Sequence, residues 1–209
     1  MLLIFDLDGT LIDSQACIVK ATQEAFRAKG IEIPSEEIIT NAMGIPIEVT
    51  FPKWSHATDA SDLIADYRRF YGELSKTELT VFEGIPQALE ILSKTHTLAI
   101  ATSKKHQVAE NNLRTCQLHS FFSMTIGSDD VANYKPHPES IYKILERFPI
   151  YKEACWMIGD ATTDLNMGIS ASVKTCAVTW GAHSARQLSE LNPNAIIDQP
   201  HELINLFKA

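Results

Sequence analysis

Short apolar runs recur along the chain and predict buried strands. The clearest runs cover residues 2–5, 97–101, 122–126, 155–158 and 175–178, and a weaker one covers residues 195–197. Each run is followed by turn-forming residues and then by a stretch with helical periodicity. Strands that alternate with helices favour an α/β fold, with a mainly parallel sheet and helices on both of its faces.

This alternation is interrupted after the first strand, because no strand pattern occurs between Ser14 and Thr80. One amphipathic helix is predicted over residues 16–29, ending at Gly30, and another over residues 59–75. Their apolar faces hold Ile18, Ala21, Ala25 and Ala28 in the first helix, and Leu63, Ile64, Tyr67, Phe70 and Tyr71 in the second. The triplet Ser35-Glu36-Glu37 is typical of a further helix start. The sequence therefore predicts a core of residues 1–14 and 81–209 and a small all-helical insert of residues 15–80.

The composition of the chain disfavours some classes of binding partner. The chain has 209 residues, a net charge of −8 and 21% charged residues, which disfavours coating of nucleic acid or of an anionic membrane. No apolar run approaches the length of a membrane span, and the apolar start is too short for a signal peptide. The cysteines Cys17, Cys116, Cys155 and Cys176 form no CxxC pair, which favours reduced thiols. We expect a cytoplasmic protein without nucleic-acid or membrane partners.

Four polar groups follow predicted strands, where open α/β sheets bind their ligands. They are Asp6 and Asp8 in the run DLDGT, Thr102 and Ser103, Lys135 before Pro136, and Asp160 and Asp164 in the run GDATTD. Each group alone has an ordinary explanation as a turn, a helix cap or a surface charge, and Lys104 and Lys105 are expected to be surface charges. Together the four groups indicate one site, because they converge on one edge of one sheet.

The four groups and the helical insert resemble the motifs of the haloacid dehalogenase (HAD) superfamily. The resemblance covers nearly the whole chain and implies a Rossmann-like parallel-sheet core with a C1-type helical cap, similar to the phosphoglycolate phosphatase branch. It implies that Asp6 is the nucleophile and a Mg²⁺ ligand, and that Asp8 is the general acid and base and binds Mg²⁺ through its carbonyl oxygen.

The resemblance also implies roles for the later motifs. Thr102 and Lys135 would hold phosphoryl oxygens, with Ser103 beside them, and Asp160 would be the third protein ligand of the metal. Asp164 would contact the metal through water or stand behind its ligands. Ala161 departs from the family pattern, because many relatives have serine there.

The chemistry of these residues suits phosphoryl transfer. A carboxylate can accept a phosphoryl group, Mg²⁺ offsets the repulsion between carboxylate and phosphate, and a lysine adds a further positive charge. A dehalogenase is disfavoured, because it has little use for Asp8 or for Asp160 and Asp164. A phosphomutase and a non-catalytic regulatory relative are the alternatives.

The helical insert is expected to set specificity. Candidate positions are residues 43–46, Lys53 and Arg68, with Gly44 as a substrate contact, although a helix C-cap at Gly44 and a surface charge at Arg68 are the simpler interpretations. The expected partner is a small phosphorylated metabolite. Phosphoglycolate is the default by resemblance, while sugar phosphates, nucleoside monophosphates and pyrophosphate stay open. We expect a monomer or a weak homodimer.

Overall fold

The structure is a computed structural model that describes residues 1–208. Its centre is a six-stranded sheet in the order β5-β4-β1-β6-β7-β8, and all neighbouring strands pair in parallel. The strands are β1 (Leu2–Phe5), β4 (Thr97–Ala101), β5 (Met124–Ile126), β6 (Cys155–Gly159), β7 (Lys174–Val178) and β8 (Ala195–Ile197). The predicted parallel sheet is therefore confirmed.

The run at residues 122–126 was predicted too long, because β5 begins only at Met124. Phe122 instead packs its ring edge-on against Phe5, with 6.1 Å between the ring centroids. An apolar side chain that faces the core from a loop gives the same sequence signal as one in a strand.

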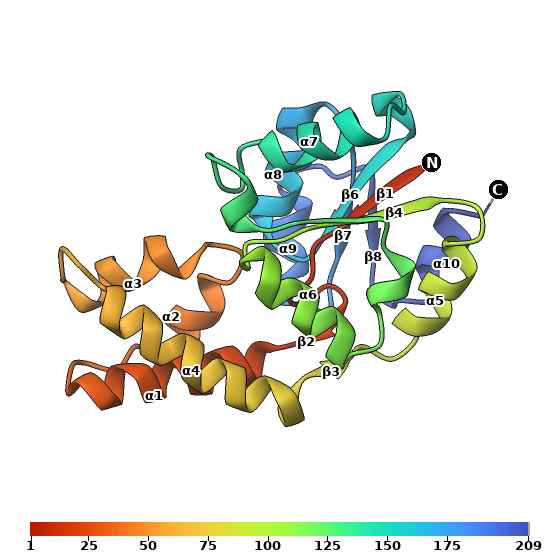
Figure 1. Ribbon diagram of the computed structural model, residues 1–209. Coiled ribbons are helices and arrows are strands. Elements are labelled where there is room, and N and C mark those ends of the chain that lie inside the picture. The colour runs from red at the N-terminus through yellow and green to blue at the C-terminus, as the bar shows by residue number, and fades with distance from the viewer. Residues whose placement is uncertain (209) are drawn as a thin grey trace.

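Helices cover both faces of the sheet (Figure 1). On one face lie α5 (Ile85–Leu92), α6 (His106–Thr115) and α10 (Glu202–Leu206), and on the other lie α7 (Glu139–Arg147) and α8 (Thr162–Ala171), with α9 (Ala185–Ser189) beside α8. Short 3₁₀ turns are η1 (His119–Phe121), η2 (Ser128–Asp130) and η3 (Lys152–Ala154). Leu3 and Phe5 point into the first layer and Leu2 and Ile4 into the second. A strand buried on both faces has no polar side, which explains the continuous apolar run.

Four helices that lie between β1 and β4 along the sequence form a separate layer beyond one end of the sheet (Figure 1), and we call them the cap. They are α1 (Gln15–Lys29), α2 (Glu36–Asn41), α3 (Ile47–Ser55) and α4 (Ser61–Glu78). The two-residue strands β2 (Ile12–Asp13) and β3 (Thr80–Val81) pair antiparallel where the chain enters and leaves the cap. The helices thus lie where the sequence puts the insert, while the division into separate domains stays a prediction.

The cap has its own apolar core around the aromatic rings of Phe26, Phe51 and Tyr67. The predicted face of α1 was partly wrong, because Ala28 is exposed and Phe26 is fully buried. Phe26 buries far more apolar area than an alanine, so it sets which side of the helix turns inward.

The cap lies at the end of the sheet opposite the two chain termini (Figure 1). The carboxyl ends of β1, β4 and β6 therefore face it. No helix within residues 1–208 is long and apolar enough to cross a membrane.

Candidate active site

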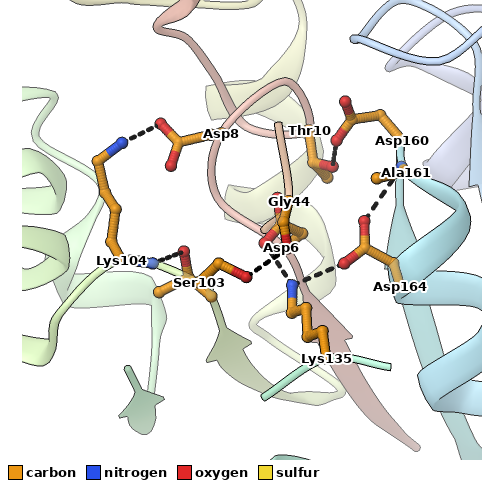
Figure 2. A network of polar contacts seen from close by, with 11 residues as sticks. Asp6, Asp8, Thr10, Gly44, Ser103, Lys104, Lys135, Asp160, Ala161 and Asp164 are labelled. Carbon is orange, nitrogen blue, oxygen red and sulfur yellow. Dashed lines mark hydrogen bonds and ion pairs between the residues drawn. The ribbon is translucent and has the colours of Figure 1, made fainter. Parts of the chain in front are cut away.

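Asp6 lies at the centre of the site. It follows β1 directly, its N–H donates to the carbonyl of Ile158 on β6 at 2.9 Å, and its side chain is buried. The ammonium group of Lys135 donates to Asp6 Oδ1 and to Asp164 Oδ1, at 2.6 Å each. Figure 2 shows Lys135 between the two carboxylates. Sequence reasoning alone favoured a solvated lysine at position 135, but its side chain is only 2% exposed.

Three buried carboxylates meet at this point. Asp6, Asp160 and Asp164 each offer an oxygen within 4.8 Å of the others. Asp160 is held from two sides, since Thr10 Oγ1 and the N–H of Ala182 both donate to it at 2.7 Å. Asp164 Oδ2 accepts from the N–H of Ala161 at 3.1 Å. The structure therefore brings together the acids that the sequence assigned to one metal site.

This cluster has more negative than positive charge. Three carboxylates face one ammonium group, which leaves two negative charges if all ionise. Burial raises the pKa of Asp6 well above its usual range, although Lys135 opposes this. Burial also raises the pKa of Asp160 to about 7, with a further increase from the nearby Asp164 carboxylate. Carboxylate oxygens and an excess of two negative charges are the donor set that suits Mg²⁺.

Lys135 stays charged in this setting. Burial alone would lower the pKa of its ammonium group, but the carboxylates of Asp164 and Asp6 raise it above its usual value. Because the charged lysine can meet a phosphate as well as the carboxylates, it suits phosphoryl binding.

The free energy of unfolding of the metal-free protein should decrease as the pH rises from about 4 to about 7. Asp160 has an ordinary pKa of 3.8 and a pKa of about 7 in the fold, so across this window the folded chain binds more protons than the unfolded chain. Stability then decreases as the pH rises. Urea unfolding in EDTA across this range measures the slope, and Asp160→Asn should flatten it. A wild-type urea midpoint that rises with pH through this window would contradict the raised pKa of Asp160. Added Mg²⁺ should offset the loss near neutral pH, since it binds the ionised form.

Asp8 faces away from the three acids. Its carboxylate accepts from Ser14 Oγ and from Lys104 Nζ, the latter at 2.5 Å, and Figure 2 shows this pair on the far side of the DLDGT turn from Asp160. The expectation that Lys104 is a surface charge was wrong. Its side chain is 11% exposed and its ammonium group lies 4.6 Å from the centroid of the Tyr71 ring. Lys104 thus holds Asp8 in place, while the predicted contact of the Asp8 carbonyl with the metal stays a prediction.

Replacing Lys104 with glutamine should lower kcat about tenfold to a hundredfold, which is what loss of one hydrogen bond to a charged group typically produces. The fall in kcat should exceed any change in KM, because the main contact of Lys104 is with Asp8. Steady-state kinetics with a phosphate ester measures both constants. Lys94→Gln is the matched control, since Lys94 is exposed and pairs with Glu90 on the surface of α5. A variant of Lys104 with wild-type kcat would show that the ion pair does not position Asp8.

Thr102 and Ser103 lie at the end of β4, beside the cap. Thr102 is buried, and its hydroxyl accepts from the N–H of Lys104 at 3.2 Å. Ser103 Oγ donates to the carbonyl of Gly44 at 2.6 Å, which joins the core to the cap (Figure 2). Gly44 is not a helix C-cap as the simpler interpretation had it, because α2 ends at Asn41 with Ala42 as its C-cap. The phosphate contacts of Thr102 and Ser103 stay predictions.

The remaining cap candidates, Lys53 and Arg68, differ in their surroundings. Lys53 is exposed. Arg68 pairs with Glu48 at 2.5 Å, and both residues line the cavity between cap and core. Arg68 is thus an exposed charge, as the simpler interpretation had it, and it is paired with Glu48.

Sequence reasoning missed the loop after β7, which closes over Asp160. Ala182 donates to the Asp160 carboxylate through its backbone, and Trp180 Nε1 donates to the carbonyl of Thr10 at 3.1 Å. A Cβ added at Gly181 would lie 2.3 Å from Asp160 Oδ2, so only glycine fits there. The rule that sites form at strand ends could have pointed to this loop, since it follows a predicted strand.

Known proteins resemble this chain over its full length. The sequence profile of the haloacid dehalogenase-like hydrolases matches residues 3–178. A protein of Dickeya dadantii named "Probable phosphatase IndB" is 34% identical, and the match covers 100% of this chain and 94% of that protein. Pyrophosphatase PpaX of Oceanobacillus iheyensis is 30% identical, over 98% of this chain and 95% of that protein.

A solved structure has the same fold. It is a haloacid dehalogenase-like hydrolase from Streptococcus pneumoniae, 29% identical, with a TM-score of 0.89 over 99% of this chain and 98% of that one. The profile match covers most of the chain, and the fold and the acidic cluster agree with it. The chain therefore belongs to the haloacid dehalogenase-like hydrolase family and is one of its phosphatases.

Proposed function

We propose that the chain is a magnesium-dependent phosphatase that hydrolyses a small phosphorylated metabolite through an aspartyl-phosphate on Asp6. The observation that carries the proposal is the contact of Asp6 with Lys135 at 2.6 Å, inside a buried cluster with Asp160 and Asp164. A buried carboxylate next to a fixed cation and two further acids suits attack on a phosphate with a divalent metal bound.

Asp6 would act as the nucleophile. One of its carboxylate oxygens forms a bond to phosphorus while the bond from phosphorus to the ester oxygen breaks. Lys135 and the hydroxyl of Thr102 would hold the phosphoryl oxygens as negative charge moves during transfer. Hydrolysis of the acyl phosphate by water then returns Asp6 and releases inorganic phosphate.

Asp8 would move the proton in both steps. As an acid it protonates the leaving alkoxide, and as a base it then takes a proton from the attacking water. Its separation from the three-acid cluster and its contacts with Ser14 and Lys104 support a role different from that of Asp6.

Asp6 and Asp160 would hold the Mg²⁺ together with the carbonyl of Asp8, and Asp164 would contact it through water or support these ligands. When bound, Mg²⁺ neutralises charge on the carboxylates and on the phosphate, so that two anions can approach each other.

The substrate class rests on resemblance. Phosphoglycolate, sugar phosphates, nucleoside monophosphates and pyrophosphate are candidates, and the name of the relative pyrophosphatase PpaX supports the last of them. We expect the enzyme to work as a monomer or a weak homodimer in the cytoplasm.

Release of phosphate from p-nitrophenyl phosphate tests the proposal. Activity should require Mg²⁺, disappear with EDTA and return when Mg²⁺ is restored. Asp160→Asn should raise the Mg²⁺ concentration needed for half-maximal activity, whereas Asp198→Asn, at an exposed position, should not. Activity that survives EDTA unchanged would contradict the metal.

A phosphomutase would use the same core, because it differs only in where the phosphoryl group goes next. A phosphorylated enzyme that outlasts exchange of the substrate would favour that alternative. A non-catalytic relative would show no turnover with any ester.

A further inference from the structure

A partly open cavity of about 170 Å³ lies between the cap and the core, next to Asp8. Lys104 and Ser103 contribute to its wall from the core side, and α2, α3 and α4 contribute from the cap side. Because Asp8 is the proposed proton donor to the leaving group, the part of the substrate that leaves must occupy this cavity.

The cap side of the cavity is mostly apolar. Its wall includes Ile39, Met43, Ile47, Phe51, Trp54 and Tyr67. The rings of Phe51 and Tyr67 meet edge-on with 5.3 Å between their centroids, and Trp54 lies 5.8 Å from Phe51. Ile39 and Met43 are 2% and 7% exposed, yet neither belongs to the apolar core of the cap among residues 1–208. Both residues line the cavity.

Two of the three cations that line the cavity are paired with carboxylates. Arg68 is paired with Glu48 and Lys104 is paired with Asp8, at 2.5 Å each. Lys105 has no carboxylate within ion-pair distance among residues 1–208, and it is partly exposed at the start of α6. An anionic leaving group would have to compete with the carboxylates of Glu48 and Asp8 for the two paired cations, and most of the remaining wall is apolar.

We propose that this enzyme prefers a phosphate monoester whose leaving group carries an uncharged, apolar part of about the size of one ring. The inference rests on the proposed phosphatase function and names the substrate class of that same site. A dry apolar cavity of roughly 150 Å³ can hold a benzene molecule, so the cavity here has room for an aromatic or branched aliphatic group. Apolar walls with a few polar groups at one end are typical of a small-molecule site that recognises shape.

This preference separates the chain from two anionic substrates. The leaving group of pyrophosphate is a second phosphate, and the leaving group of phosphoglycolate carries a carboxylate. Each would need cations, and most cations of the wall are already paired with carboxylates. The substrate in the name of the relative PpaX is therefore disfavoured for this chain.

Four phosphate compounds test the preference in the wild-type enzyme with Mg²⁺: benzyl phosphate, ethyl phosphate, phosphoglycolate and pyrophosphate. Benzyl and ethyl phosphate both release a primary alcohol, so their comparison isolates the ring. We expect kcat/KM for benzyl phosphate to exceed that for the other three at least about tenfold, as apolar pocket contacts typically discriminate. Equal values for benzyl and ethyl phosphate, or a higher value for either anionic compound, would overturn the proposal.

A charge placed in the wall should reverse the preference. Met43→Lys keeps the length of the side chain but puts an ammonium group beside the cavity, so kcat/KM for benzyl phosphate should fall at least about tenfold relative to that for phosphoglycolate. Ile38→Lys is the matched control, because Ile38 is 48% exposed on α2 and does not line the cavity. An unchanged ratio in a folded Met43→Lys protein would contradict the assignment of the wall.

Binding separates failure of this inference from failure of the proposed function. If none of the esters is hydrolysed, not even p-nitrophenyl phosphate, the proposed function fails. Calorimetric binding of benzylphosphonate and methylphosphonate still reports on the cavity in that case. Tighter binding of benzylphosphonate supports the apolar site, and equal binding of the two phosphonates overturns it.

Discussion

Asp6→Asn should lower kcat at least about a thousandfold, which corresponds to about 4 kcal/mol of lost transition-state stabilisation. The amide keeps nearly the shape of the carboxylate but is a far weaker nucleophile, so it cannot form the acyl phosphate. Lys135 keeps its second partner, Asp164, at 2.6 Å, and we expect the fold to persist. Phosphate release under saturating ester measures kcat, and circular dichroism checks the fold.

Asp13→Asn is the matched control for this prediction. Asp13 follows in the same N-terminal segment but is exposed on β2, so its replacement should leave kcat unchanged. Trapping should distinguish the two proteins as well: wild type incubated with labelled ester and quenched in acid should retain label, and Asp6→Asn should not. A folded Asp6→Asn protein with wild-type turnover would rule out Asp6 as the nucleophile.

The central strands of the sheet were predictable because they are buried on both faces. Leu2 to Phe5 alternate between the two layers, and both layers are apolar, so the sequence has no polar interruption. The pair of β2 and β3 was not predictable, since two residues carry no period. Helix α3 was missed because Pro46 precedes it and Pro52 lies inside it, and prolines usually mark a break.

The acids of the site were predictable from position alone. Asp6 and Asp160 follow adjacent strands, and parallel strands bring their carboxyl ends together. Lys104 was not predictable, because a lysine that folds back onto Asp8, 96 residues earlier in the chain, looks like a solvated one in the sequence. The contact of Ala182 with Asp160 was also hidden, because a backbone N–H has no side-chain signal.

Lys135→Met should both inactivate and destabilise the protein. Lys135 is the only cation in contact with the Asp6 and Asp164 carboxylates within residues 1–208, and all three side chains are buried. Breaking a buried ion pair by removing one partner typically lowers the free energy of unfolding by about 3–5 kcal/mol. Activity should fall at least about a hundredfold, as it does when one donor to a developing negative charge is lost.

Urea unfolding near neutral pH in EDTA measures the destabilisation. Lys76→Met is the control, because Lys76 is exposed and the variant protein should unfold like wild type. The loss should shrink at lower pH, because burial already raises the pKa of Asp6 and protonation then removes the charge that Lys135 balanced. Adding Asp164→Asn to Lys135→Met should recover part of the stability, since it removes one of the two carboxylates that Lys135 contacted, but it should not recover activity. A Lys135→Met protein that unfolds at the wild-type urea concentration in EDTA would show that the acids do not depend on the lysine. The cluster would then have to be protonated in the metal-free enzyme, with Lys135 serving the phosphate alone.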